Sequence, residues 1–234
     1  NTMNVTRDFL FDVAVPVKTE SYSPVSHRNI LDATYEQLDR HNLRVTSEGF
    51  NSNKFGTEVI GYLDINHPDL NTLGMRLAFR NSYDKSMSVA FAAGSVVWIC
   101  ENGCVSGEIQ YIRKHTGGVV QELNEKIITT INQLGEHFDK MVRHSQQLHN
   151  IEMTKEQYAE LMGRLFIVDK LVTPTQLNIV SREIDTPSFE DFVDMNAWSL
   201  YNHVTYSLKE AHPLHYLEQH TGFHNFMQAE FNLV

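Results

Sequence analysis

The sequence lacks most features of secreted and membrane-spanning proteins. Only 2 cysteines occur in 234 residues, which argues against a disulfide-stapled secreted domain. The longest apolar run, residues 89–100, is shorter than the roughly 20 residues that a helix needs to cross a bilayer. Asp8 and Asp12 interrupt the first apolar residues, so we expect no secretory signal. A cytoplasmic protein without a membrane partner is the prediction.

The chain also lacks the common catalytic and cofactor motifs. It contains no Walker phosphate loop, no Rossmann glycine fingerprint and no Gly-x-Ser-x-Gly nucleophile elbow. Asp84 and Glu108 can form a carboxylate pair if their hairpins adjoin, but a turn cap at Asp84 is the simpler interpretation. We therefore expect no cofactor, and the pattern leans away from an enzyme.

Basic charge is scarce in the second half of the chain. The net charge is −10, and residues 121–234 hold 16 acidic against 8 basic side chains. Nucleic-acid binding depends on neutralising phosphates, so the acidic second half argues against nucleic acid covering the whole chain. Residues 1–120 are nearly balanced, with 11 basic and 13 acidic side chains, and can still present a local basic face.

The hydrophobic pattern predicts an α+β fold. Residues 1–24 read as an extended N-terminal arm, and apolar positions between His27 and Asn42 recur at helical spacing. Alternating or apolar runs then predict an antiparallel sheet of about six strands, at 43–47, 57–65, 75–80, 89–91, 96–100 and 105–112.

A long helix is predicted after Gly118. Apolar residues recur every three or four positions from Val120 to about Ile151 and would pack on the sheet. Capping boxes begin at Thr154 and Thr173, and helical patterns continue through 189–209 to the histidine-rich end. We expect a core of residues 25–151 and a helical C-terminal part, 152–234, belonging to the same compact unit.

Residues 79–108 read as two β-hairpins in series, with a polar turn at 81–86 and a tight turn at Asn102-Gly103. Through this segment the chain resembles the phage- and plasmid-borne family described only as phage/plasmid-like proteins or a domain of unknown function. The residues that carry the resemblance are Asn81-Ser-x-Asp84, Cys100-x-Asn102-Gly103, Gly107-Glu108, the helix after Gly118, Arg7–Phe11 and Asn196-Ala-Trp198-x-x-Tyr201-Asn202-x-Val204-Thr205.

The resemblance implies carriage on prophages, plasmids and transferred islands, near genes of DNA transactions and defence. It supplies no catalytic residues. We therefore expect a non-enzymatic accessory of a mobile element, acting in single-strand nucleic-acid binding, annealing or counter-defence.

The candidate nucleic-acid surface lies on the predicted sheet. Arg76 and Arg80 project from the same side of one strand, and tyrosines nearby can stack on bases. Charges on surface strands also serve solubility alone. The predicted binding residues are Arg76, Arg80, Tyr83, Lys85, Tyr111, Arg113 and Lys114.

Two alternatives stay open. The stripe on the long helix can pair with a host or phage protein, or with a second copy in a homo-oligomer. A metal-dependent hydrolase can be built on the C-terminal histidines, with His220 and His224 on one helix face. Twelve histidines cluster by chance, however, and Cys100 and Cys104 lack the second ligand pair of a zinc site, so no metal is expected.

Overall fold

The computed structural model describes residues 3–67, 70–97, 102–211 and 215–234, with the backbone alone for residues 67, 70–73, 96–97 and 102–110. The chain divides into two compact units. Unit 1 comprises residues 1–94 and 108–135, and unit 2 comprises residues 95–107 and 136–234. The predicted α+β class, with a helical C-terminal part, is confirmed.

The sheet is antiparallel over β1 to β4, and its strand order is β1-β2-β3-β4-β5-β6, so every strand neighbours the next in sequence. The strands are β1 (Met3–Val5), β2 (Val45–Ser52), β3 (Glu58–His67), β4 (Leu70–Ser82), β5 (Val89–Val97) and β6 (Asn102–Arg113). The far ends of β5 and β6 belong to unit 2.

About six strands were expected and the described residues form six, but they are not the same six. The runs 89–91 and 96–100 were predicted as two strands, whereas β5 is continuous from Val89 to Val97. The sixth strand is β1, in the arm that was expected to be extended, and a short helix, α1 (Arg7–Asp12), follows it. Asn102 and Gly103 begin β6, so the prediction of a tight turn at these two residues is wrong.

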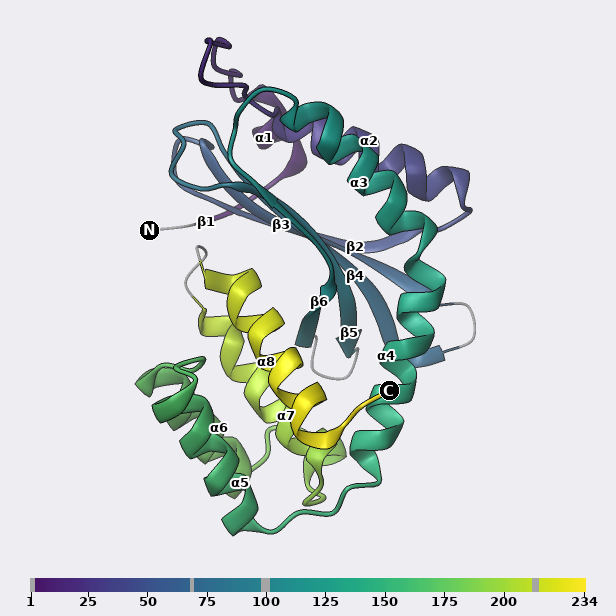
Figure 1. The fold of residues 1–234 in the computed structure, drawn as a ribbon, viewed down its shortest axis with the longest axis vertical. Coiled ribbons are helices and arrows are strands. Elements are labelled where there is room, and N and C mark those ends of the chain that lie inside the picture. The colour runs from purple at the N-terminus through teal and green to yellow at the C-terminus, as the bar shows by residue number, and fades with distance from the viewer. Residues whose placement is uncertain (1–2, 68–69, 98–101, 212–214) are drawn as a thin grey trace. The chain divides into compact units, whose positions relative to one another are not determined.

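Two helices cover one face of the sheet in unit 1, α2 (His27–Arg40) and α3 (Val119–Asn132), and they lie side by side (Figure 1). Leu31 and Leu38 on α2 and Leu77 and Phe79 on β4 are buried. These residues form a layer between the helices and the sheet. The alternating side-chain directions of β4 explain it, because its odd-numbered residues lie on one face of the sheet and its even-numbered residues on the other.

A glycine makes room for two aromatic rings in this layer. Gly61 on β3 pairs with Phe50 on β2 and with Phe79 on β4. A Cβ atom at Gly61 would lie 2.5 Å from the Phe79 ring and 2.7 Å from Phe50. The two rings, with centres 6.2 Å apart, therefore fill the space over the glycine.

The predicted long helix is broken at Gln133 into α3 and α4 (Leu134–His149). Gly135, which has a low helix propensity, stands directly after the break. The predicted apolar stripe is buried within the chain, including Leu123, Ile127 and Phe138. The stripe is thus occupied by the protein's own core.

The remaining helices belong to unit 2, and both predicted capping boxes are present, at Thr154 and Thr173. The segments are α5 (Lys155–Gly163), a π-helical turn (Arg164–Val168), α6 (Pro174–Asp185), a 3₁₀ turn (Glu190–Phe192), α7 (Ala197–Ser207), a second 3₁₀ turn (Leu208–Glu210) and α8 (Tyr216–Phe231). In the described ranges no helix combines the length and the apolar character that crossing a membrane requires.

Candidate functional site

One end of the sheet in unit 1 gathers the loops that carry the Asn81–Asp84 motif. We call this region the turn end and define it as residues 53–57, 83–88 and 114–118. The Tyr83 N–H donates to the Thr57 carbonyl at 2.7 Å, which ties the first two loops together. The Ser23 N–H donates to the His115 carbonyl at 2.9 Å and attaches the arm to the third loop.

Asn81, which is fully buried, is the centre of a polar network beneath the turn end. Its amide nitrogen donates to the Val25 carbonyl at 2.6 Å and to His27 Nδ1 at 3.0 Å. Its amide oxygen accepts from His115 Nε2 at 2.7 Å. We call His27, Asn81 and His115 the buried relay.

The hydrogen bonds fix the tautomer of His27. An amide nitrogen only donates, so His27 Nδ1 accepts and the proton lies on Nε2, which donates to the Gly56 carbonyl at 2.9 Å. Burial lowers the pKa of His27 to about 4, and the hydrogen bond to the Gly56 carbonyl opposes this shift. Burial also lowers the pKa of His115.

Both histidines are therefore neutral at pH 7, and neither is open to solvent, since His27 is 0% and His115 6% exposed. The Tyr83 ring stacks on His27 with centres 4.0 Å apart, and its hydroxyl accepts the His27 backbone N–H at 2.9 Å. The relay thus connects the three loops through hydrogen bonds between buried, neutral side chains.

The hairpin loop between β2 and β3 presents a lysine and a phenylalanine to solvent. Asn53 shapes it, because its side-chain oxygen accepts the N–H groups of Phe55 at 3.2 Å and Thr57 at 3.0 Å. Phe55 is 66% exposed and is the one exposed aromatic side chain among the residues whose burial is described. The Lys54 ammonium lies 4.7 Å from the centre of the Phe55 ring.

The other two loops add further cations. Lys85 is exposed, and its ammonium lies 4.7 Å from the Tyr22 ring centre. Lys114 is exposed after β6. Asp84, which precedes Lys85, accepts the Ser86 N–H at 2.9 Å. Asp84 therefore caps this turn, as expected from the sequence. The turn end therefore combines Lys54, Lys85 and Lys114 with one exposed aromatic ring.

Arg76 and Arg80 lie on the same face of β4 but are buried, at 7% and 6% exposure. Arg76 forms a two-point ion pair with Asp64, at 2.6 and 2.7 Å, and its guanidinium lies 4.1 Å from the Tyr62 ring centre. Arg80 Nε donates to the Ser88 carbonyl at 3.3 Å. The two arginines do not form the open basic surface that the sequence interpretation required.

The other predicted residues separate into buried and exposed groups. Tyr83 is buried in contact with the relay, and Tyr111 is half-buried. Arg113 forms an ion pair with Glu122 and donates to the Gly117 carbonyl at 3.1 Å. Of the predicted set, Lys85 and Lys114 are thus the side chains available to a ligand at the turn end.

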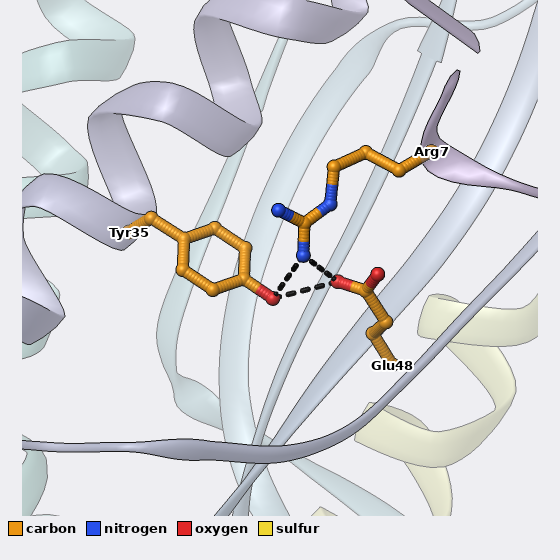
Figure 2. A network of polar contacts seen from close by, with 3 residues as sticks. All are labelled: Arg7, Tyr35 and Glu48. Carbon is orange, nitrogen blue, oxygen red and sulfur yellow. Dashed lines mark hydrogen bonds and ion pairs between the residues drawn. The ribbon is translucent and has the colours of Figure 1, made fainter. Parts of the chain in front are cut away.

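A second polar cluster lies between α1, α2 and β2 (Figure 2). One terminal nitrogen of Arg7 donates to the Tyr35 hydroxyl at 2.7 Å and to a Glu48 carboxylate oxygen at 2.5 Å. The Tyr35 hydroxyl donates to the same carboxylate oxygen at 2.6 Å. Burial and the Glu48 hydrogen bond raise the pKa of Tyr35, so this phenol stays protonated.

A hollow of about 560 Å³ opens beside this cluster. Its lining comprises Arg7, Tyr35, Glu36, Leu38, Asp39, Leu43, Arg44 and Val45. Figure 2 shows the second terminal nitrogen of Arg7 outside both hydrogen bonds, and the Arg7 side chain is 36% exposed. The hollow thus offers an apolar floor and a partly open guanidinium.

The C-terminal histidines do not assemble a metal centre in the part of the chain that the structure describes, where no group of three or more His, Cys, Asp or Glu side chains is placed to hold an ion. His220 and His224 are both 2% exposed, and His224 Nδ1 lies 3.0 Å from the Tyr201 hydroxyl. Cys100 and His212 lie outside the described residues, as do the side chains of Cys104 and Glu108.

Sequence reasoning missed Phe55 and the relay. The pattern Asn53-Lys-Phe-Gly56 is typical of a turn. It would have placed Phe55 in a loop, where an aromatic residue is unusual. His27 and His115 gave no signal, because the relay forms only when residues far apart in sequence meet across the fold.

The family model described as Domain of unknown function (DUF932) matches residues 15–222, well over half of the chain. No curated protein and no solved structure matches.

Proposed function

The chain belongs to this family of domains of unknown function, DUF932, and we propose that it binds single-stranded nucleic acid at the turn end of unit 1. The observation that supports the proposal is the exposed Phe55 ring beside Lys54, on a loop that is fixed from below. An unpaired base stacks on an aromatic face with roughly 1–3 kcal/mol, and a cation beside the ring meets the phosphate.

The rigidity of the platform strengthens this assignment. The carbonyl of Gly56, the residue after Phe55, accepts a hydrogen bond from His27 Nε2–H. Gly56 also adopts a φ of +71°, which favours glycine. A ring held in one position loses little conformational entropy on binding, so the loop is suited to stacking.

The distribution of charge favours the turn end as the surface that binds nucleic acid. The chain carries −10 overall, whereas the exposed charges of the turn end are Lys54, Lys85 and Lys114 against the single acid Asp84. The cations are few, so the proposal is for a short contact of a few nucleotides and not for a long electrostatic groove.

The alternatives find less support. The stripe on α3 and α4, on which the protein-interaction hypothesis relied, is buried, with Leu123 and Ile127 at 0% exposure. The hydrolase hypothesis needs a third ligand beside His220 and His224, and none is placed there in the described ranges. The mobile-element role, as an accessory in annealing or counter-defence, stays a prediction from the resemblance, and single-strand binding is the activity that it would use.

Fluorescence anisotropy with a labelled 20-nucleotide oligo-dT and with a duplex of equal length, both at low salt, tests the proposal. We expect binding to the single strand, and Phe55→Ala should weaken it about 5- to 160-fold, which corresponds to losing one stacked base. Ile167→Ala is the matched control, since Ile167 is 70% exposed but lies in unit 2.

Two results would overturn the proposal. One is the absence of oligo-dT binding at low salt, and the other is equal affinity for the original chain and Phe55→Ala. A circular dichroism spectrum of each variant shows that its fold is retained.

A further inference from the structure

The outer edge of β2 is only partly covered. β1 pairs with β2 through Met3 with Ser52, Asn4 with Asn51 and Val5 with Phe50, and the ladder ends there. The chain then turns at Thr6 into α1. Among the residues that the structure describes, no strand therefore lies beside the outer side of β2 from Val45 to Gly49.

The backbone of Glu48 points toward this open side. Along an antiparallel strand, successive residues direct their N–H and C=O groups alternately to the two neighbours. The Asn53 N–H donates to the Glu58 carbonyl on the β3 side, so Asn53, Asn51 and Gly49 face β3. Ser52, Phe50 and Glu48 consequently face outward, and β1 reaches only the first two.

The hollow of about 560 Å³ lies beside the same edge. Leu38, Leu43 and Val45 form its apolar part. A strand laid along β2 alternates its side chains between the two faces of the sheet, so every second side chain would point into this hollow. Unpaired edges with an adjacent pocket are the basis of peptide recognition by strand addition.

The charges indicate which side chains the partner brings. Arg44 is exposed at the rim, and the Arg7 guanidinium is partly open. The lining also holds two acids: Glu36 forms an ion pair with Arg40 at 2.5 Å, and Asp39 is exposed. A carboxylate on the partner can bind between Arg7 and Arg44.

We propose that the open edge of β2 binds an extended segment of a partner protein as an added strand, with an apolar side chain in the hollow and a carboxylate beside Arg7 and Arg44. The segment extends the sheet where β1 stops. The bulge between Val45 and Ser47 limits regular pairing to a few residues, so a peptide of about eight residues is long enough. The site is separate from the turn end and does not depend on nucleic-acid binding.

A library of displayed random octapeptides, selected on the immobilised full chain, supplies the probe. We expect enrichment of sequences that alternate an apolar residue with other residues and contain Asp or Glu. In hydrogen exchange measured by NMR, the Glu48 amide should exchange fast in the free chain and at least tenfold more slowly with the enriched peptide.

Two substitutions at one position separate backbone from side-chain recognition. Glu48→Pro removes the outward N–H and is tolerated at an edge, whereas Glu48→Ala keeps the N–H and removes the carboxylate. Glu48→Pro should reduce peptide affinity at least 30-fold and Glu48→Ala less than 5-fold. The exchange rate of the Glu48 amide in the unaltered chain decides the question even if Glu48→Pro fails to fold.

Three results would overturn the proposal. They are the failure of any octapeptide to be enriched, enriched peptides that leave the Glu48 amide unprotected, and protection that appears without peptide as the protein concentration rises. The last result would identify a second copy as the occupant.

Discussion

Asn81 forms three buried hydrogen bonds beneath the turn end. They reach Val25, His27 and His115. A buried polar group that loses its partner costs about 1–3 kcal/mol, so the value of this residue lies in what would be left unpaired without it.

Asn81→Ala should therefore lower the free energy of unfolding by about 2–4 kcal/mol, because it leaves a small cavity and strands one donor, His115 Nε2–H, and two acceptors, the Val25 carbonyl and His27 Nδ1. Urea denaturation measures this change. Asn29→Ala is the control, since Asn29 shares one half-buried hydrogen bond with Asn124 and should cost under about 1 kcal/mol. Equal losses in the two variants would contradict the central role of Asn81.

His27 should make stability depend on pH. Its pKa in the folded chain is about 4, below the ordinary value of 6.5. As the pH falls below 6.5, the unfolded chain takes up a proton that the folded chain refuses, so stability declines until the pH reaches about 4. The decline attributable to His27 is at most about 3 kcal/mol.

Urea denaturation at pH 7, 5.5 and 4.5 measures this effect. Burial also lowers the pKa of His115, His149 and His203, so the contribution of His27 is the difference from His27→Gln, whose stability should fall less steeply. Parallel pH curves for the two proteins would refute the assignment.

At the scale of elements, local signals located helices and strands well. Thr154 and Thr173 form the capping boxes that their spacing indicated, and the alternation of Met75 to Arg80 identified the middle of β4. β1 was not predictable, because three residues carry no period and their pairing partner is more than forty positions away, with Val5 opposite Phe50.

The candidate site shows the same division. Lys85 and Lys114 were predicted and are exposed. Arg76 was predicted as a surface cation, but its ion-pair partner Asp64 stands opposite it on the next strand. The pattern within one strand indicates on which side of the sheet a side chain lies. It does not indicate which residue of the neighbouring strand stands opposite it.

Two glycines in helical segments of unit 2 give opposite expectations. Gly163 has helical φ and ψ angles of −60° and −43°, and apart from its chain neighbours and the backbone of its own helix no heavy atom lies within 4 Å of the position of a Cβ. Gly163→Ala should raise the free energy of unfolding by about 0.5–1 kcal/mol. A Cβ at Gly222 would lie 2.6 Å from Leu171 Cδ2, so Gly222→Ala should cancel or reverse the gain. Thermal unfolding compares them, and equal shifts would contradict this packing.

For the whole molecule, the distribution of charge determines how salt acts on the proposed binding. The turn end carries three exposed lysines, whereas the chain as a whole has a net charge of −10. Single-strand affinity falls with a log–log slope of about −0.7 per phosphate contact, so we expect a slope of about −2 between 50 and 300 mM salt. Lys85→Ala should bring it to about −1.4. A slope of −5 or steeper would mean that the contact extends well beyond the turn end.

The space above Gly61, which the rings of Phe50 and Phe79 fill, also constrains how sequences of this family can diverge. Phe50 and Phe79 occupy the space that a side chain at position 61 would need, so the three positions share one volume. Substitutions among them should be epistatic: Gly61→Ala is harmful alone and tolerated once both Phe50 and Phe79 have become leucine. Relatives are therefore expected to change these residues together, as a covarying trio that spans three strands.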